Sequence, residues 1–399
     1  MLKITIITSG TLPVPSVNGG AVETLIQTFI NNNERTNEFE ICLFSIFNAN
    51  ALQLSHSYKN TKFIFINQTS LYYSINRILR HIVNRIKPNY LCNQFIYEVL
   101  KYQNILFEAS VIIIENSPRF ASYIRKITKT TIGLHLHNDY LNRETILTSQ
   151  KILNDLDFIV AVSQYIKNRV SEISQNKNKV EIVYNGIKLD RFINYSCHSE
   201  RINFLAQFKI NEGEIIILFS GRLQESKGIK ILIETFLEIS ASYNIKLIVI
   251  GSSEFKDSKK NKFIKELEKL SSEAVDKIIF TGYIDHSEIH KIYSLADFAV
   301  IPSLAPEALS LTSIEAQASG LPVIITDSGG LPETINIKSG IIIKRGPNMK
   351  NELKNSMIQL ITNTNLRKEM SIEAKKQAIK FNDQFYYDSF SSILRKNIK

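Results

Sequence analysis

The chain has 399 residues, of which 44% are hydrophobic and 22% charged, a balance typical of a soluble globular protein. This length excludes a single ordinary core and predicts two domains. The formal net charge of +10 favours anionic partners such as nucleotides, nucleic acid or an acidic membrane face. The three cysteines are scattered and match neither a disulfide framework nor a metal-binding spacing, so we expect a cytoplasmic protein.

Short apolar runs alternate with longer helical patterns along the chain, which predicts parallel sheets flanked by helices. The start, MLKITIITSG, alternates and ends at a turn signal, so it predicts a first strand rather than a signal peptide. No apolar run approaches the roughly 18 residues that span a bilayer. The predicted strands are residues 4–8, 40–44, 62–66, 111–115, 131–135, 158–162, 180–184, 215–220, 246–250, 278–281, 298–301, 323–326 and 340–343. Helices are predicted between them, for example at residues 21–31, 228–240 and 259–272.

Two segments, 157–163 and 297–303, share an aspartate, an apolar run and a closing serine, and each is predicted to be a late strand of its own sheet. This echo agrees with two similarly built domains. We predict domains at residues 1–190 and 213–375, a linker at 191–212 and a helical tail at 376–399.

The basic segment 71–106 contains a helical pattern with an apolar stripe, and three arginines fall mostly off that stripe. The favoured interpretation is an ordinary helix whose stripe lies in the core. The alternative is an interfacial helix that rests on anionic lipid. The stripe consists of Ile75, Ile78, Leu79, Ile82 and Ile86, and the arginines are Arg77, Arg80 and Arg85.

The run from Gly221 to Gly228 follows an apolar strand and opens a helix, which is a suitable cradle for an anion. Within it, Arg222 offers a planar fork to phosphate oxygens and Lys227 offers a point charge. A basic surface loop is the alternative. Near the start of the chain, the pair Gly19-Gly20 follows the first strand and would let the backbone approach a ligand, although a plain turn also explains it.

His135 and His137 lie two residues apart at a strand end and therefore on one face of it. Open α/β sheets bind ligands at the carboxyl ends of their strands, so we expect His137 to contact substrate. A metal site is disfavoured because no third ligand is evident nearby. Asp155 and Asp157 have the D-x-D form of metal-dependent sugar transferases, but Asp157 precedes a buried strand and is expected to be structural.

The segment 302–332 places Glu307 and Glu315 eight positions apart around the start of a predicted helix at 310–319. Thr312 and Glu315 match the capping-box pattern, which predicts a helix start near Thr312. Backbone N–H groups at such a start suit a phosphate, with one glutamate left for a nucleotide and the other for a polyhydroxyl group. The alternative is that Glu315 only caps the helix and Glu307 is solvated.

Several short motifs occur in a fixed order along the chain. They are Gly19-Gly20, Val162-Ser163, Tyr184-Asn185-Gly186-Ile187, Gly221-Arg222-Leu223, Lys227-Gly228, Asp297, Pro302-Ser303, Glu307, Glu315, 318–323 and 329–333. Together they resemble glycosyltransferase family 4, retaining enzymes of the GT-B fold, over nearly the whole chain. The resemblance implies two Rossmann-like domains that face each other across a cleft, the first binding the acceptor and the second the nucleotide sugar. It also implies a C-terminal helix that crosses back to the first domain.

The resemblance implies a role for each matching residue. Arg222 and Lys227 would bind the donor diphosphate, Glu315 the ribose hydroxyls and Glu307 the hydroxyls of the donor sugar. With His137 near the reacting carbon, Arg222, Lys227 and Glu307 would form the catalytic group. The cationic pair would stabilise the leaving diphosphate, so no metal or other cofactor is expected. The further donor contacts implied are Gly19, Gly20, Tyr283 near the base, and the backbone N–H groups of Leu309, Ser310, Leu311 and Thr312.

The chain departs from the family after the first glutamate, where Phe-Gly is common and Ala308-Leu309-Ser310 stands here. We expect transfer of a hexose or related sugar from a UDP- or GDP-sugar to a lipid-linked or growing glycan, as in bacterial surface-polysaccharide synthesis. The enzyme would be cytoplasmic, with a peripheral contact of segment 71–106 at the inner face of the membrane. An epimerase of similar fold and an inactive nucleotide-sugar-binding regulator remain alternatives. A nucleic-acid partner is not expected, because no recognition motif is present.

Overall fold

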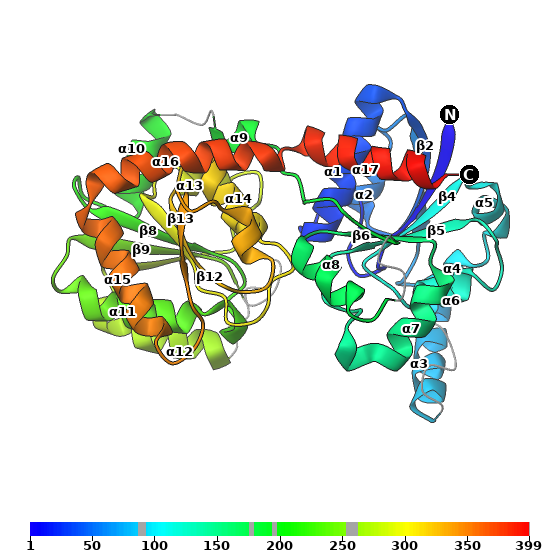
Figure 1. The fold of residues 1–399 in the computed structure, drawn as a ribbon, viewed down its shortest axis with the longest axis horizontal. Coiled ribbons are helices and arrows are strands. Elements are labelled where there is room, and N and C mark those ends of the chain that lie inside the picture. The colour runs from blue at the N-terminus through cyan, green and yellow to red at the C-terminus, as the bar shows by residue number, and fades with distance from the viewer. Residues whose placement is uncertain (87–92, 175–178, 194–197, 253–261, 399) are drawn as a thin grey trace. The chain divides into compact units, whose positions relative to one another are not determined.

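The computed structural model describes residues 1–86, 93–174, 179–193, 198–252 and 262–398, so Cys92 and Cys197 lie outside it. The chain divides into two compact units. Unit 1 comprises Met1–Gly186 and Asp383–Lys399, and unit 2 comprises Ile187–Asn382. Each unit is a parallel sheet flanked by helices (Figure 1). The α/β architecture of two Rossmann-like units is therefore confirmed.

The sheet of unit 1 has the strand order β3-β2-β1-β4-β5-β6-β7. Its central strands are continuous apolar runs because helices bury both faces of a parallel sheet, and every residue of β4 is buried. The strands are β1 (Leu2–Ile7), β2 (Phe39–Ile46), β3 (Thr61–Ile66), β4 (Val111–Glu115), β5 (Thr131–Leu136), β6 (Phe158–Ala161) and β7 (Val180–Ile182). The sequence predicted each of them to within two residues.

Helices cover the two faces of this sheet. The first begins after Gly20, whose φ of 103° suits glycine, and ends at Asn37 in the left-handed conformation that commonly closes a helix. The helices of unit 1 are α1 (Ala21–Thr36), α2 (Ala49–Ser55), α3 (Leu71–Ile86), α4 (Gln94–Val99), α5 (Gln103–Glu108), α6 (Phe120–Ile124), α7 (Ile146–Asp155), α8 (Gln164–Ser171) and α17 (Asp383–Asn397).

Helix α17, the last of the chain, packs on α1 within unit 1 (Figure 1). The ring centroid of Phe29 on α1 lies 5.2 Å from those of Tyr387 and Phe390. All three rings are buried in the core that also contains Ile4 and Ile41 of the sheet. Aromatic pairs at this separation add to the free energy of burying their surface. The expected return of the C-terminal helix to the first domain is confirmed.

The favoured interpretation of α3 is wrong, because its apolar stripe does not lie in the core. Ile75, Ile78, Leu79 and Ile82 are each about half exposed, between 48% and 56%. Arg80 stacks over the ring of Tyr97, with 3.9 Å from its guanidinium carbon to the ring centroid. The side chains of Arg77 and Ile86, and residues 87–92, lie outside the description. Helical spacing correctly indicates an amphipathic helix but does not say what covers its apolar face.

The sheet of unit 2 has the strand order β10-β9-β8-β11-β12-β13. Its strands are β8 (Ile215–Ser220), β9 (Ile245–Ile250), β10 (Ile278–Gly282), β11 (Phe298–Ile301), β12 (Val323–Thr326) and β13 (Gly340–Ile343), each within one residue of its prediction. Its helices are α9 (Asp190–Ile193), α10 (His198–Gln207), α11 (Ile229–Ser240), α12 (Lys262–Ser271), α13 (Ile289–Tyr293), α14 (Leu311–Ala318), α15 (Met349–Thr362) and α16 (Thr364–Ala378). The predicted start of α12, at residues 259–261, lies outside the description.

The two aspartates of the repeated segments have the same structural role, since each binds the backbone of the neighbouring strand. Asp157 accepts a hydrogen bond from the backbone N–H of Ile132, and Asp297 accepts one from Ile216, both at 2.8 Å. Each thereby fixes the beginning of the neighbouring strand. The structural interpretation of Asp157 is confirmed, because its carboxylate also binds Arg125.

In both sheets the strand order reverses beside the first strand of the unit, between β1 and β4 and between β8 and β11. Loops that follow these strands diverge to opposite faces, and such points bind ligands in open α/β sheets. Among the described helices, none is long and apolar enough to cross a membrane.

Candidate functional site

The loop after β8 is bounded by glycines that the structure requires. Gly228 has φ of 70°, and a Cβ there would lie 1.9 Å from the carbonyl oxygen of Pro302. The close approach brings the loop against the segment that follows β11, where the N–H groups of Leu304 and Ala305 donate to the carbonyl of Ser226. The sequence motif Lys227-Gly228 and the motif Pro302-Ser303 therefore form one structure.

Glu307 occupies the centre of this structure. Its Oε1 lies 2.6 Å from Lys227 Nζ and accepts a hydrogen bond from the hydroxyl of Ser303 at 2.5 Å. The backbone N–H of Gly330 donates to the carbonyl of Glu307 at 2.7 Å. The interpretation of Glu307 as a solvated loop charge is therefore wrong. Arg222 lies on the same glycine-bounded loop with an exposed side chain.

Glu315 is buried on α14 and does not cap the helix. Ser310 is the N-cap, since its hydroxyl accepts from the backbone N–H of Ser313, and this places the helix start before Thr312. The capping box of Thr312 and Glu315 is therefore wrong, whereas the predicted helix at 310–319 is confirmed, because α14 begins at Leu311, one residue before Thr312. The carboxylate of Glu315 instead accepts hydrogen bonds from His286 Nε2 at 2.9 Å and from the hydroxyl of Tyr293 at 3.3 Å.

These contacts shift the pKa values of the two side chains that donate to Glu315. The hydrogen bond to Glu315 is the main reason that the pKa of His286 is raised above its usual 6.5. Burial, followed by repulsion from Glu315, raises the pKa of Tyr293 well above 10, so this phenol stays a donor. Tyr283 shares the loop after β10 with His286, and burial raises the pKa of its phenol.

The backbone at the start of α14 contains the other predicted donor contacts. Leu309 and Ser310 are buried, and Leu311 and Thr312 are half-buried in the first turn. The N–H groups of a first turn have no partner within their helix and carry partial positive charge. Ser310 stands where the family commonly has glycine, and its hydroxyl is used in capping.

In unit 1, Gly19 and Gly20 have positive φ and precede α1. A Cβ on Gly20 would lie 2.3 Å from Oε2 of Glu23, so this glycine leaves room for a buried carboxyl group. Burial is the largest cause that raises the pKa of Glu23 to about 7, and Glu115 adds repulsion. Glu23 was predicted from the sequence only as part of a motif, without a role of its own.

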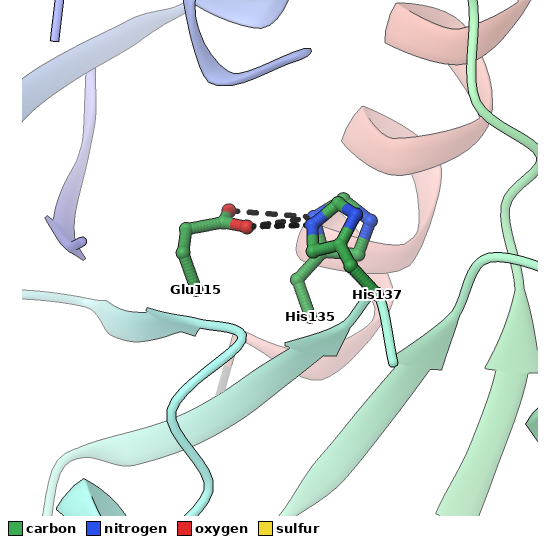
Figure 2. A group of neighbouring side chains, drawn as sticks. All are labelled: Glu115, His135 and His137. Atoms are coloured by element: carbon green, nitrogen blue, oxygen red, sulfur yellow. Dashed lines mark hydrogen bonds and ion pairs between the residues drawn. The ribbon is translucent and has the colours of Figure 1, made fainter. Parts of the chain in front are cut away.

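Glu115 went undetected, although it is the end of an otherwise apolar buried strand. It pairs in register with His135 across β4 and β5. Its Oε2 lies 3.1 Å from His135 Nδ1 and 3.0 Å from His137 Nε2 (Figure 2). Possible ligand atoms of the three side chains lie within 4.8 Å of one another, so Glu115 is the third group that the argument against a metal assumed to be missing. A third possible ligand is therefore present, although the contacts among the three side chains are hydrogen-bond distances.

Hydrogen bonds and burial set the charges of this group. Burial alone would raise the pKa of Glu115. Interactions with the two histidines more than offset this effect and lower the pKa to about 2. Burial, followed by the neighbouring His135, lowers the pKa of His137 to about 4. At neutral pH the group therefore contains a carboxylate beside a neutral His137.

Comparison with known proteins places these features in context. Residues 200–377 match the family model described as glycosyl transferases group 1. An uncharacterized glycosyltransferase of Methanocaldococcus jannaschii is 32% identical over 219 residues, and the match spans 53% of each chain. The lipopolysaccharide 1,2-N-acetylglucosaminetransferase of Salmonella typhimurium is 29% identical over 57% of each chain. The match thus spans about half the length of these two relatives. Spore coat protein SA of Bacillus subtilis is 24% identical over 99% of this chain and 100% of its own.

Solved structures resemble the fold over the full length. A glycosyltransferase from Rickettsia africae has a TM-score of 0.77 at 19% identity, with 100% of this chain and 99% of that chain covered. Anabaena Alr3699/HepE in complex with UDP and glucose also has a TM-score of 0.77, at 16% identity, with 99% of this chain and 100% of that chain covered. At such identities the likeness shows the GT-B fold alone.

Proposed function

We propose that the chain, which matches the family model of glycosyl transferases group 1 over residues 200–377, is a glycosyltransferase that moves a sugar from a UDP- or GDP-sugar to a lipid-linked or growing glycan. Transfer would retain the anomeric configuration and need no bound metal. The observation that carries this proposal is the contact of Lys227 with Glu307, 2.6 Å apart at the carboxyl edge of the unit 2 sheet. The lipopolysaccharide enzyme among the relatives supports a surface-polysaccharide role.

Unit 2 is the proposed donor site. Arg222 and Lys227 bind the diphosphate, and the first-turn N–H groups of α14 add partial positive charge. Glu315 binds the ribose hydroxyls in place of His286, and Tyr283 flanks the base. The complex of the HepE protein with UDP and glucose supports a nucleotide sugar as the ligand class.

Glu307 is the proposed contact for the hydroxyls of the donor sugar. Its Oε1 is already shared by Lys227 and Ser303, which fixes the carboxylate before a ligand binds. Lys227 would then neutralise charge on the diphosphate as the bond to the sugar breaks. The acceptor oxygen bonds to the anomeric carbon on the same face, and its proton passes to the departing phosphate oxygen. In unit 1, His137 is proposed to contact the sugar near the reacting carbon, and the Gly19-Gly20 backbone is proposed to lie under the donor and the acceptor.

A matched pair of ion-pair variants tests the donor site. Lys227→Met should weaken binding of UDP or GDP by about tenfold or more, since a charge-assisted hydrogen bond contributes about 1.5–3 kcal/mol. Lys230→Met is the control, because Lys230 pairs with Glu266 at 2.5 Å on α11 and α12 and is half exposed. Calorimetry measures both. Equal affinity of the two variants would contradict the proposed cradle.

A second pair of variants tests the role of Glu307 in transfer. Glu307→Gln should reduce sugar transfer far more than nucleotide affinity, while Glu266→Gln should change neither. A thermal-shift panel of UDP-, GDP- and ADP-sugars first identifies the nucleotide sugar that stabilises the protein selectively. That nucleotide sugar then serves as the substrate in the transfer assay. Formation of an epimer without transfer would instead indicate the epimerase, and tight binding without turnover the regulator.

A peripheral contact with an anionic membrane is proposed for α3. Its stripe of half-exposed apolar residues and the exposed Arg85 have the character of an interfacial helix. Replacing Ile78 and Leu79 by serine should reduce sedimentation with vesicles of phosphatidylglycerol and phosphatidylcholine. Leu147→Ser is the control, since Leu147 is 86% exposed in unit 1 but lies outside α3. Unchanged sedimentation of the α3 variant would refute the contact.

A further inference from the structure

One carboxylate in unit 1 holds two histidine rings. Glu115 ends β4, and His135 and His137 stand at the end of the adjacent strand β5 and just beyond it. Oε2 of Glu115 lies 3.0 Å from Nε2 of His137 and 3.1 Å from Nδ1 of His135. Both rings direct a nitrogen at the same carboxylate (Figure 2). The two rings also contact each other, with centroids 4.0 Å apart.

The geometry determines where the protons are. The hydrogen bond of His137 Nε2 is to Oε2 of Glu115 and that of His135 Nδ1 is to Oε1. A carboxyl group carries at most one proton, so at least one of these two ring nitrogens must donate an N–H. The low pKa of Glu115, about 2, makes the group a carboxylate, which only accepts hydrogen bonds. His137 therefore donates through Nε2 and His135 through Nδ1. A neutral imidazole with its proton on Nε2 has a lone pair on Nδ1.

The backbone around His137 is held as firmly as the ring. Asn116 adopts φ of 52°, directly after Glu115. The side-chain oxygen of Asn116 accepts a hydrogen bond from the backbone N–H of His137 at 3.1 Å. The backbone N–H of Asn116 donates to the carbonyl of His135 at 2.8 Å. Behind them, the ring of His135 is fully buried and its centroid lies 4.8 Å from that of Phe390. The position and the rotamer of His137 are thus set without a ligand.

We propose that Glu115 is a positioning residue that holds His137 as the Nε2–H tautomer, so that Nδ1 accepts a hydrogen bond from a hydroxyl of the sugar substrate. The inference rests on the proposed function for the identity of that hydroxyl. It assigns His137 the role of an acceptor and not of a proton donor. A group that has no proton to donate, such as an ionised carboxylate or phosphate, would be repelled at this position.

Other ionisable groups face this carboxylate. Glu23 on α1 and Tyr386 on α17 both interact with Glu115 through charge, and burial raises the pKa of each. Neither lies on the strands that carry the histidines. When Glu23 is protonated and Tyr386 is neutral, neither of them adds charge. The Glu115 carboxylate is then the main negative charge near His137. Experiments are best done at about pH 6, below the pKa of about 7 at Glu23, where that carboxyl group is protonated, and above the pKa of about 4 at His137.

The tautomer can be measured directly in the unliganded protein. Long-range ¹H–¹⁵N correlation spectra distinguish Nε2–H from Nδ1–H, and His137→Gln assigns the signal. We expect His137 to be neutral with its proton on Nε2. A proton on Nδ1, or an imidazolium at about pH 6, would overturn the inference. One zinc ion per chain in metal analysis, with both histidine signals shifted on its addition, would overturn it in favour of a metal site.

Variants of Glu115 then link the tautomer to transfer. Glu115→Gln should mix the tautomers, because an amide can donate as well as accept, and should lower kcat by about 100-fold through misplacement of His137. Glu115→Asp keeps the carboxylate and should recover the tautomer and part of the activity. Glu181→Gln is the control, since it removes another carboxylate of unit 1, one paired with Lys396. Wild-type kcat in Glu115→Gln would overturn the inference.

The positioning role of Glu115 and the proposed donor site in unit 2 can be refuted independently of each other. UDP or GDP affinity depends on unit 2 and should be unchanged in Glu115→Gln, so a loss of affinity there would contradict the positioning role. The spectrum of His137 needs no turnover. If the spectrum is as expected but Lys227→Met binds the nucleotide normally, the proposed donor site fails while the hydrogen-bond assignment at Glu115 stands.

Discussion

Gly329 offers a sharp test of how the Glu307 segment is held. Its φ is 57°, and a Cβ there would lie 2.3 Å from the carbonyl oxygen of Glu307 and 2.8 Å from its backbone nitrogen. Both are main-chain atoms, so a side-chain rotation cannot relieve the contact. In Gly329→Ala, the segment that contains Glu307 must therefore move, and Lys227 would no longer face the carboxylate at 2.6 Å.

The cost of this substitution has three parts. A left-handed residue other than glycine costs about 1–2 kcal/mol. Overpacking adds about 1–3 kcal/mol, and the hydrogen bond from Gly330 to Glu307, 2.7 Å long, adds about 1 kcal/mol if it breaks. The expected loss in the free energy of unfolding is about 3–6 kcal/mol from these terms.

Gly213→Ala isolates the backbone part of that cost. Gly213 has φ of 84°, and a Cβ there meets no heavy atom within 4 Å, so only about 1–2 kcal/mol should be lost. Urea unfolding measures the loss of stability in both variants. A transfer assay tests whether Glu307 is still placed for activity. Activity should fall in Gly329→Ala and persist in Gly213→Ala. Equal destabilisation of the two variants would refute the argument from close contact.

Three further predictions follow from the buried rings and charges. Phe390→Ala should cost about 3–5 kcal/mol of unit 1 stability in thermal unfolding, and calorimetry should give unchanged UDP affinity. Because the pKa of His137 is about 4 instead of 6.5, the unfolded chain binds more protons between these values, and the free energy of unfolding falls as the pH drops from 6.5 to 4. His137→Gln should flatten that slope by up to about 1.4 kcal/mol per pH unit in urea titrations; an unchanged slope would contradict a neutral His137. The raised pKa of His286 means that its charged contact with Glu315 is complete below 6.5 and lost as the pH rises through the raised value. UDP affinity should therefore increase with pH in the wild type and not in His286→Ala, as measured by calorimetry.

The sequence was sufficient for the sheets and for the order of the motifs. Buried parallel strands are uninterrupted apolar runs, so their positions are visible along the chain without knowledge of the pairing. The loop with Lys227 could likewise be found, because a glycine on each side of a basic loop marks a strand-to-helix turn. Its place in one donor site with Glu307 was inferred from the family resemblance, and their direct contact was not predicted, since 80 residues separate the two.

Errors arose where the outcome depends on competing partners. Thr312 and Glu315 satisfy the capping pattern, yet Ser310 lies closer to the free N–H groups and caps the helix, which leaves Glu315 for His286. The stripe of α3 has the right period, but period alone does not reveal whether a neighbour covers it. Glu115 was missed because its meeting with His137 depends on the register of two strands, which the sequence does not state.

The place of α17 in unit 1 has a consequence for synthesis on the ribosome. Residues 383–397 are translated after the whole of unit 2, yet Tyr387 and Phe390 complete the core around Phe29 of unit 1. While unit 2 emerges, the nascent first unit therefore exposes an unfilled apolar face on α1. Unit 2 can finish folding earlier, although it is made later. We expect the nascent chain to need shielding by a chaperone at this face until α17 has left the exit tunnel.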